Sequence, residues 1–258
     1  MPQVKPNLLM CDWTVLSLRP YAQHAVAHCA RKLRGAKFLA CSSMKLEAIK
    51  NDDLLETALA CDYVIVTSPA AARFAGQSPA FTATQKPLWF ALGEGTASAL
   101  RRIGVANVSI PDKGSNSESL LAMAALQNLR GKTIGLITAP GGRGLIEPAL
   151  IDRGALVRVV LMYQRKIISI EAEQIQTLYR LDLPFAILCS SHELFTSFWQ
   201  QIDTELKEKM RAGLWVLSSA RLQALLQQSG ILNTTISSSP QPDAMLAHLI
   251  HVQTQQVR

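Results

Sequence analysis

Short apolar runs alternate with helical patterns along the whole chain, and this alternation constrains the fold more than any other feature. The runs occupy residues 15–18, 63–67, 88–92, 132–138, 185–189 and 214–217, and the helical patterns after them occupy 21–34, 70–75, 96–103, 145–152, 193–201 and 222–228. Short continuous apolar runs separated by helices are typical of parallel strands buried on both faces. Gly35, Gly104, Gly154 and Gly230 follow four of the helical patterns, as C-terminal glycines do. We therefore predict a doubly wound α/β fold.

The chain also repeats itself. The sequence VIVTSP at 64–69 corresponds to AILCSS at 186–191, an offset of 122. At an offset of 126, the residues Gly104, Ile110 and Ser117 correspond to Gly230, Ile236 and Asp243. A second correspondence, with offsets of 120 and 119, relates residues 18–35 to residues 139–154. Two similar α/β domains are the simplest explanation.

The order of these correspondences indicates how the domains are arranged. The N-terminal segment resembles the end of the middle block, so we expect residues 1–40 to fold with residues 167–258 as one discontinuous domain. Residues 46–162 would form an inserted domain, with linkers at 41–45 and 163–166. Short strands at 38–41 and 159–163 could pair as a two-strand hinge. Such a design predicts a ligand cleft between the domains, beyond the carboxyl ends of the strands.

The loops at those strand ends share one chemical character, since most are rich in Ser, Thr and Gly and precede a helix. They are Arg19-Pro20, 67–70 (TSPA), 93–96 (GEGT), 139–143 (APGGR), 189–192 (CSSH) and Ser218-Ser219. Ser and Thr in such places are ordinary helix N-caps. The same loops would present free backbone N–H groups, which attract carboxylates and phosphates.

Charge and composition limit the classes of ligand and partner that the chain is expected to bind. The formal net charge of +7 favours an anionic ligand. The basic residues are scattered and form no stripe, so we expect no nucleic acid partner. No export signal and no run of roughly 18–20 apolar residues is present, which predicts a cytoplasmic protein without a membrane span. The five cysteines are odd in number and widely spaced, so a disulfide framework is not expected. His24 and His28, beside Cys29, are not completed into a metal site.

Several enzyme signatures are absent from the sequence. There is no G-x-x-x-x-G-K-[ST] phosphate loop, no G-x-G-x-x-G fingerprint and no nucleophile elbow. A nucleotide- or flavin-binding protein is therefore disfavoured. A cytoplasmic two-lobed module that binds or senses a small anionic ligand stays open as an alternative to an enzyme.

Three motifs in order resemble those of the uroporphyrinogen-III synthase family. They are Ser68-Pro69 after an apolar strand, G-E-G-T-A-x-x-L-x-x-x-G at 93–104, and G-G-R-x-x-L…R-G-A-x-V…Y at 142–163. The resemblance runs from Arg19-Pro20 to the final helix near His248. It implies a hydro-lyase that cyclises the linear tetrapyrrole hydroxymethylbilane to uroporphyrinogen III, inverting the terminal pyrrole ring and releasing water, in porphyrin and haem biosynthesis. No cofactor or metal is implied, and we expect a monomer.

The resemblance also implies residue roles. Tyr163 would donate the proton that expels water, and Thr96 would face the cleft. Arg19, Ser68, Arg143 and Ser190 would position carboxylates, with arginine offering paired donors. The neighbouring loop residues that complete the expected substrate site are Pro69, Ala70, Gly142, Ser191 and Ser219. Each assignment has an alternative interpretation. The hydroxyl residues could be ordinary helix caps, the arginines could be surface charges, and Tyr163 could be an ordinary aromatic residue at a strand end. The family's second Gly-x-x-Thr-like loop is replaced by SSAR at 218–221, where Ser219 could substitute.

Overall fold

The computed structural model describes residues 13–20, 36–82, 87–141 and 144–256. The chain divides into two compact units, one formed by Met1–Lys45 with Lys166–Arg258 and the other by Leu46–Arg165. Each unit is built around its own five-stranded sheet, and every strand pair in both sheets is parallel. We call them the discontinuous unit and the inserted unit.

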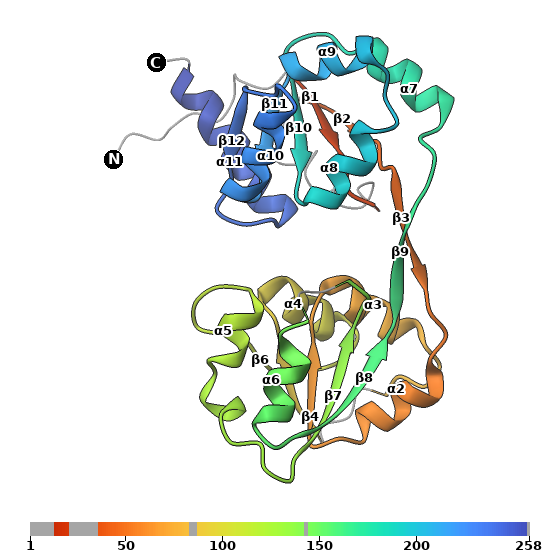
Figure 1. The fold of residues 1–258 in the computed structure, drawn as a ribbon, viewed down its shortest axis with the longest axis vertical. Coiled ribbons are helices and arrows are strands. Elements are labelled where there is room, and N and C mark those ends of the chain that lie inside the picture. Colours follow the sequence, from red (N-terminus) through yellow and green to blue (C-terminus); the bar gives the residue numbers. More distant parts are fainter. Residues whose placement is uncertain (1–12, 21–35, 83–86, 142–143, 257–258) are drawn as a thin grey trace. The chain divides into compact units, whose positions relative to one another are not determined.

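The inserted unit is a sheet with helices on both faces (Figure 1). Its strands are β4 (Tyr63–Val66), β5 (Leu88–Ala91), β6 (Val108–Ser109), β7 (Thr133–Thr138) and β8 (Leu156–Leu161), in the order β6-β5-β4-β7-β8. Its helices are α2 (Asp52–Leu59), α3 (Pro69–Gln77), α4 (Glu94–Arg102), α5 (Ser117–Leu121), the 3-10 turn η1 (Ala124–Leu126) and α6 (Ile146–Asp152). Val64 and Val66 pack with α2, α3 and α4, while Ile65 packs with α5 and α6. The strand is apolar throughout because both of its faces are covered.

The discontinuous unit repeats this plan. Its strands are β1 (Thr14–Ser17), β2 (Lys37–Ala40), β10 (Phe185–Cys189), β11 (Leu214–Leu217) and β12 (Thr234–Ile236), in the order β12-β11-β10-β1-β2. Its helices are α7 (Ala172–Tyr179), α8 (His192–Trp199), α9 (Thr204–Ala212), α10 (Ala220–Gln228) and α11 (Pro242–Gln256). Residues of α7, α8, α9 and α10 share one core cluster with Ile187 and Trp215, and α11 packs on the other face, against Ala186 and Val216.

The strand pairing confirms the repeat. Phe185 of β10 pairs with Thr14 of β1, and at the corresponding place Tyr63 of β4 pairs with Ile134 of β7. These partners differ by the same offsets of 122 and 120 that relate the two halves of the sequence. The sheets thus have one spatial order but start at different strands along the chain. The chain order reverses between β4 and β7 in the inserted unit and between β10 and β1 in the discontinuous unit. Such a reversal is the switch point where ligands of doubly wound sheets bind.

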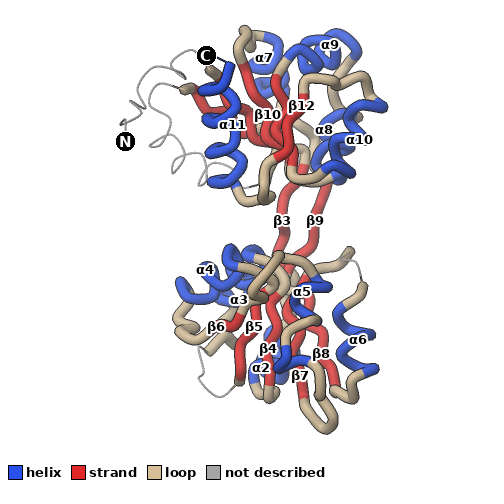
Figure 2. The backbone as a smooth tube through the Cα atoms, turned by 90° about the vertical axis from the view of Figure 1, so that its left-hand side faces the viewer, coloured by secondary structure: helices blue, strands red, loops and turns tan. Residues whose placement is uncertain are grey.

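The two-strand connection is made by other residues than the sequence suggested. Strands β3 (Met44–Ala48) and β9 (Tyr163–Ile167) form a two-stranded sheet of their own and lie side by side (Figure 2). Ile49 donates to the carbonyl of Met162, and Ile168 donates to that of Ser43, so the strands run antiparallel. The strands predicted at 38–41 and 159–163 are wrong as a hinge, because β2 and β8 contain most of those residues and pair with β1 and β7.

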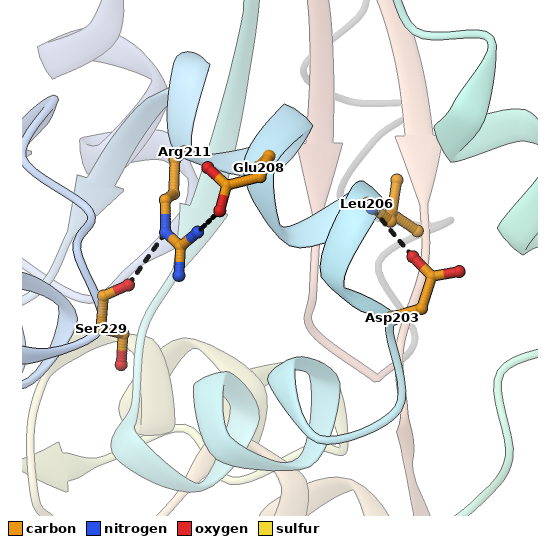
Figure 3. Close-up of polar contacts among 5 residues, drawn as sticks. All are labelled: Asp203, Leu206, Glu208, Arg211 and Ser229. Carbon is orange, nitrogen blue, oxygen red and sulfur yellow. Dashed lines mark hydrogen bonds and ion pairs between the residues drawn. The ribbon is translucent and has the colours of Figure 1, made fainter.

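The ends of α9 are fixed by side chains (Figure 3). Asp203 is the N-cap, and its carboxylate accepts the N–H of Leu206 at 2.9 Å. At the other end Arg211 forms an ion pair with Glu208 and donates from Nε to the carbonyl of Ser229 at 3.0 Å. Because Ser229 is the C-cap of α10, this bond satisfies one of the carbonyls that a helix end leaves open. Helices α9 and α10 are therefore tied together on the same face of the sheet.

Helix α2 approaches the inserted sheet closely at Gly135 of β7. A Cβ atom there would lie 2.5 Å from the carbonyl oxygen of Ala58 and 2.9 Å from its carbonyl carbon. We predict that Gly135→Ala lowers the free energy of unfolding by about 1–3 kcal/mol, as overpacked cores do, measured by urea denaturation.

The double variant Gly135→Ala/Ala58→Gly is the control. It removes the methyl group of Ala58 but not the backbone oxygen, so it should be no more stable than the single variant. A Gly135→Ala protein as stable as the parent would show that α2 is not held at this distance.

Candidate functional site

The predicted loops lie where the sequence placed them, directly after the carboxyl ends of β1, β4, β5, β7, β10 and β11. Three of their serines are helix N-caps. Ser68 accepts the N–H of Ala71 at 3.0 Å, Ser191 that of Leu194 at 3.3 Å, and Ser219 that of Leu222 at 3.3 Å. Capping therefore explains why a serine stands at each of these positions, and any further role must use the remaining capacity of the hydroxyl group.

Ser68 makes a second contact that reaches the predicted acid. Its Oγ lies 3.1 Å from the phenol oxygen of Tyr163. Tyr163 is only 3% exposed, and its ring stacks on Phe74 of α3 with centroids 5.4 Å apart and 17° between the planes. Ser68 at the N-terminus of α3 and Phe74 in the same helix thus hold the phenol in one place. This pair lies next to the switch point, where the hydroxyl oxygens of Thr67 and Thr138 are 2.7 Å apart.

A cavity of about 480 Å³ opens at this switch point inside the inserted unit. Ser68 and Tyr163 line it, together with Thr67 and Thr138. The other described residues of its lining are Leu92, Ser115, Asn116, Ser117, Leu136, Ala139, Gly141, Gly144, Leu145, Ile146, Glu147, Val159, Leu161 and Arg165. The walls combine apolar strand residues with hydroxyl groups and two charged side chains, a mixture typical of small-molecule sites.

The other predicted residues of the inserted unit have separate places. Thr96 is buried in the first turn of α4 and is not among the described residues of the cavity lining. Pro69 is the first residue of α3, and Ala70 packs against the core cluster behind it. Gly142 and Arg143 lie outside the described residues. Gly93, the N-cap of α4, has no room for a side chain, since a Cβ would lie 2.5 Å from Oγ of Ser115 in the cavity wall, so the start of the helix that carries Thr96 packs against this wall.

The equivalent switch point of the discontinuous unit carries a guanidinium group. Arg19 donates from Nε to Ser190 Oγ at 3.0 Å and from a terminal nitrogen to the carbonyl of Pro240. Ser218 donates to the carbonyl of Ser190 at 2.8 Å. Desolvation by burial lowers the pKa of Arg19, partly offset by the neighbouring Cys189. Arg19 is therefore a partly buried cation held in place by hydrogen bonds.

The described cysteines are buried free thiols. Burial raises the pKa of Cys41 and of Cys189 to about 12, so neither is a ready nucleophile. No group of three His, Cys, Asp or Glu side chains suited to a metal occurs among the described residues. Cys11, His24, His28 and Cys29 lie outside them. Within the same described ranges, no helix is both long and apolar enough to cross a membrane.

A family model described as "Uroporphyrinogen-III synthase HemD" matches residues 26–247. The chain belongs to the uroporphyrinogen-III synthase family. Membership supports the enzyme over a two-lobed binding module.

Relatives within the uroporphyrinogen-III synthase family match over part of their length. The chain is 29% identical to the enzyme of Escherichia coli K12 over 165 residues, which is 63% of this chain and 67% of that protein. It is 33% identical to the enzyme of Proteus mirabilis over 86 residues, 33% of this chain and 43% of that one. The matched segments therefore span about two thirds of the first relative and less than half of the second.

Solved uroporphyrinogen-III synthases share the fold. A mutant enzyme from Thermus thermophilus superposes with a TM-score of 0.58 at 19% identity, over 94% of this chain and 99% of that one. The enzyme from Helicobacter pylori 26695 gives 0.60 at 14% identity, over 93% and 99%. At such identities the likeness concerns architecture, and it confirms the mixed α/β fold with parallel sheets.

Sequence reasoning missed several residues of the site. Thr67 and Thr138 each follow or close an apolar strand, but only the pairing of β4 with β7 shows that their hydroxyl groups meet. Phe74 lies within the helical pattern predicted at 70–75, and nothing in the pattern marks it as a neighbour of Tyr163. Arg165 stands two residues after Tyr163, on the same face of a strand, and that spacing could have identified it.

Proposed function

We propose that this chain cyclises hydroxymethylbilane to uroporphyrinogen III, inverting the terminal pyrrole ring and releasing one water molecule, as a hydro-lyase. The observation that carries the proposal is the buried phenol of Tyr163, 3.1 Å from Ser68 on the wall of the inserted unit's cavity. A hydroxymethyl group loses water when an acid protonates its oxygen, and a fixed phenol is suited to that step.

Ser68 prepares the phenol for proton donation. A serine hydroxyl has one donor and two acceptor lone pairs. Ser68 uses one lone pair for the N–H of Ala71, so its own proton can be donated to the phenol oxygen. The proton of Tyr163 is then directed to the substrate, and the bond from Ser68 stabilises the phenolate that forms. The positive N-terminal end of α3 acts in the same sense.

The pyrrole ring supplies the electrons of this step. As the C–O bond breaks, the nitrogen lone pair moves toward the former hydroxymethyl carbon and gives an N-protonated azafulvene, whose positive charge balances the phenolate left on Tyr163. The proton of Tyr163 leaves with the hydroxyl group as water. Because the substrate is its own electron source, the proposal includes no metal or organic cofactor. We further propose that the active species is a monomer in the cytoplasm.

The discontinuous unit is proposed to bind carboxylates. Its switch point holds Arg19 beside Ser190, and the N-capped helices α8 and α10 begin in adjacent loops. The substrate carries eight carboxylates, and the chain has a net charge of +7. Ser191 and Ser219 are the N-caps of α8 and α10. The backbone amides and the dipole at a helix N-terminus favour bound anions. In the inserted unit, Thr96, Pro69, Ala70, Gly142 and Arg143 stay proposed substrate-binding residues.

The role of Arg19 can be tested on product affinity. Arg19→Ala should weaken the binding of uroporphyrinogen III by about 1–3 kcal/mol, because a charge-assisted hydrogen bond is lost. Affinity of the parent should also fall as salt is added. Equilibrium dialysis under anaerobic conditions measures both. The control is Arg180→Ala, an exposed arginine that follows α7 and precedes the amino end of β10. Equal losses in the two variants, or an affinity that ignores salt, would contradict the role.

The activity itself is tested with freshly generated hydroxymethylbilane and separation of the product isomers. The parent should give uroporphyrinogen III, also after exhaustive dialysis against a chelator, and activity should elute at the monomer mass. Tyr163→Phe should lower turnover by roughly 10²–10⁴-fold, since it removes the general acid. The uncatalysed, non-inverted isomer should then dominate.

The phenylalanine variant keeps the ring that stacks on Phe74, so its melting temperature should stay near that of the parent. A second control separates capping from chemistry. Asp203→Ala removes an N-cap from α9 at a cost of about 1 kcal/mol, and turnover below the melting transition should be unchanged. A Tyr163→Phe enzyme with near-normal turnover would show that the phenol only packs.

A further inference from the structure

The cavity of the inserted unit contains an arginine to which the function above assigns no role. Among the described residues that line it, Arg165 alone carries a positive charge, and Glu147 alone carries a negative one. Arg165 lies on β9 two residues after Tyr163, so both side chains leave the strand on the same face.

The guanidinium group of Arg165 is held close to the phenol. Its central carbon lies 5.8 Å from the centroid of the Tyr163 ring, within the range of a cation–π contact. One terminal nitrogen donates to the carbonyl of Pro140 at 3.3 Å, in the loop that follows β7. Arg165 thus bridges two sides of the cavity, and an anion bound to its planar fork would lie beside the phenol.

The size of the cavity limits what can occupy it. About 480 Å³ is in the lower part of the 300–1,000 Å³ range of small-molecule pockets. That suits one substituted pyrrole ring better than four linked rings. If Tyr163 protonates the hydroxymethyl group, the ring inside is the end ring that bears this group, at the opposite end of the substrate from the ring that is inverted. The side chain on the ring carbon next to the hydroxymethyl carbon ends in a carboxylate and has to lie near the phenol.

We infer that Arg165 binds this neighbouring carboxylate, on the ring that bears the hydroxymethyl group. The inference rests on the proposed function. Arginine suits the task because its paired N–H donors match the two oxygens of a carboxylate. Glu147 lies in the first turn of α6, where the helix dipole favours its charge. It would repel a carboxylate on that side, which leaves the Arg165 side for the anion.

A cycle of enzyme and substrate changes tests the inference. Arg165→Gln should raise the KM for hydroxymethylbilane about 10–100-fold and leave kcat within about threefold, because ground-state binding is lost. An analogue in which that one side chain ends in a methyl group should show a similar rise in KM with the parent enzyme. The parent and Arg165→Gln should then treat the analogue alike within about twofold, since the same interaction is removed by either change.

Two further variants control for charge and folding. Lys166→Gln removes the same charge from the next residue of β9, which is also exposed but faces the other side of the strand; its KM should change less than about threefold. Arg165→Lys keeps the charge without the planar fork and should recover only part of the loss.

The outcomes separate the inference from the function. A parent enzyme that forms uroporphyrinogen III, with an Arg165→Gln variant of unchanged KM, overturns the inference alone. The inference is also overturned if the rises in KM caused by Arg165→Gln and by the analogue multiply when the two are combined. An equal rise in KM in Lys166→Gln, or a large fall in kcat at constant KM, overturns it too. A parent enzyme that makes no uroporphyrinogen III overturns the proposed function and the inference with it.

Discussion

The hydroxyl group of Ser68 joins the fold of the inserted unit to its proposed chemistry. It caps α3 by accepting the N–H of Ala71, and it also contacts the phenol of Tyr163. Because β4 ends two residues before Ser68, the sheet fixes where the cap stands. Phe74, one turn into the same helix, supports the tyrosine ring. The position of the phenol is thus determined by strand β4 and helix α3, and a catalytic group held by rigid elements is better placed than one on a mobile loop.

The two units share one architecture but place different side chains at its switch point. At the switch point of the inserted unit, the cap serine contacts a phenol beside a cavity. At the same place in the discontinuous unit, Ser191 is the cap and the preceding Ser190 accepts a hydrogen bond from Arg19. In that unit, capping and the second contact therefore fall to two adjacent serines rather than to one. In the proposed function one unit donates a proton and the other binds carboxylates, which suits a substrate that has one leaving hydroxyl group and many carboxylates.

Much of this architecture could be predicted from the sequence, because buried parallel strands are apolar on both faces. The run at 185–189 coincides with β10, and the run at 214–217 coincides with β11. Strands β3 and β9 escaped this reasoning, since MKLEA and YQRKI carry charges and are mostly not buried. The apolar runs do not predict helices α2 and α9, with sequences DDLLETAL and TELKEKMRA, because neither helix directly follows such a run. The contact between Thr67 and Thr138 joins residues 71 positions apart and depends on strand register, which the sequence pattern alone does not specify.

The central claim is that Ser68 and Tyr163 act as one unit, and a double-mutant cycle on kcat/KM for hydroxymethylbilane tests it most directly. The variants are Ser68→Ala, Tyr163→Phe and their combination, assayed below the melting transition so that the lost helix cap does not intervene. If Ser68 works through the phenol, the double variant should be no slower than Tyr163→Phe, within about twofold. If the two losses multiply, Ser68 acts independently of Tyr163, and the account of the phenol as an acid prepared by the α3 cap is contradicted.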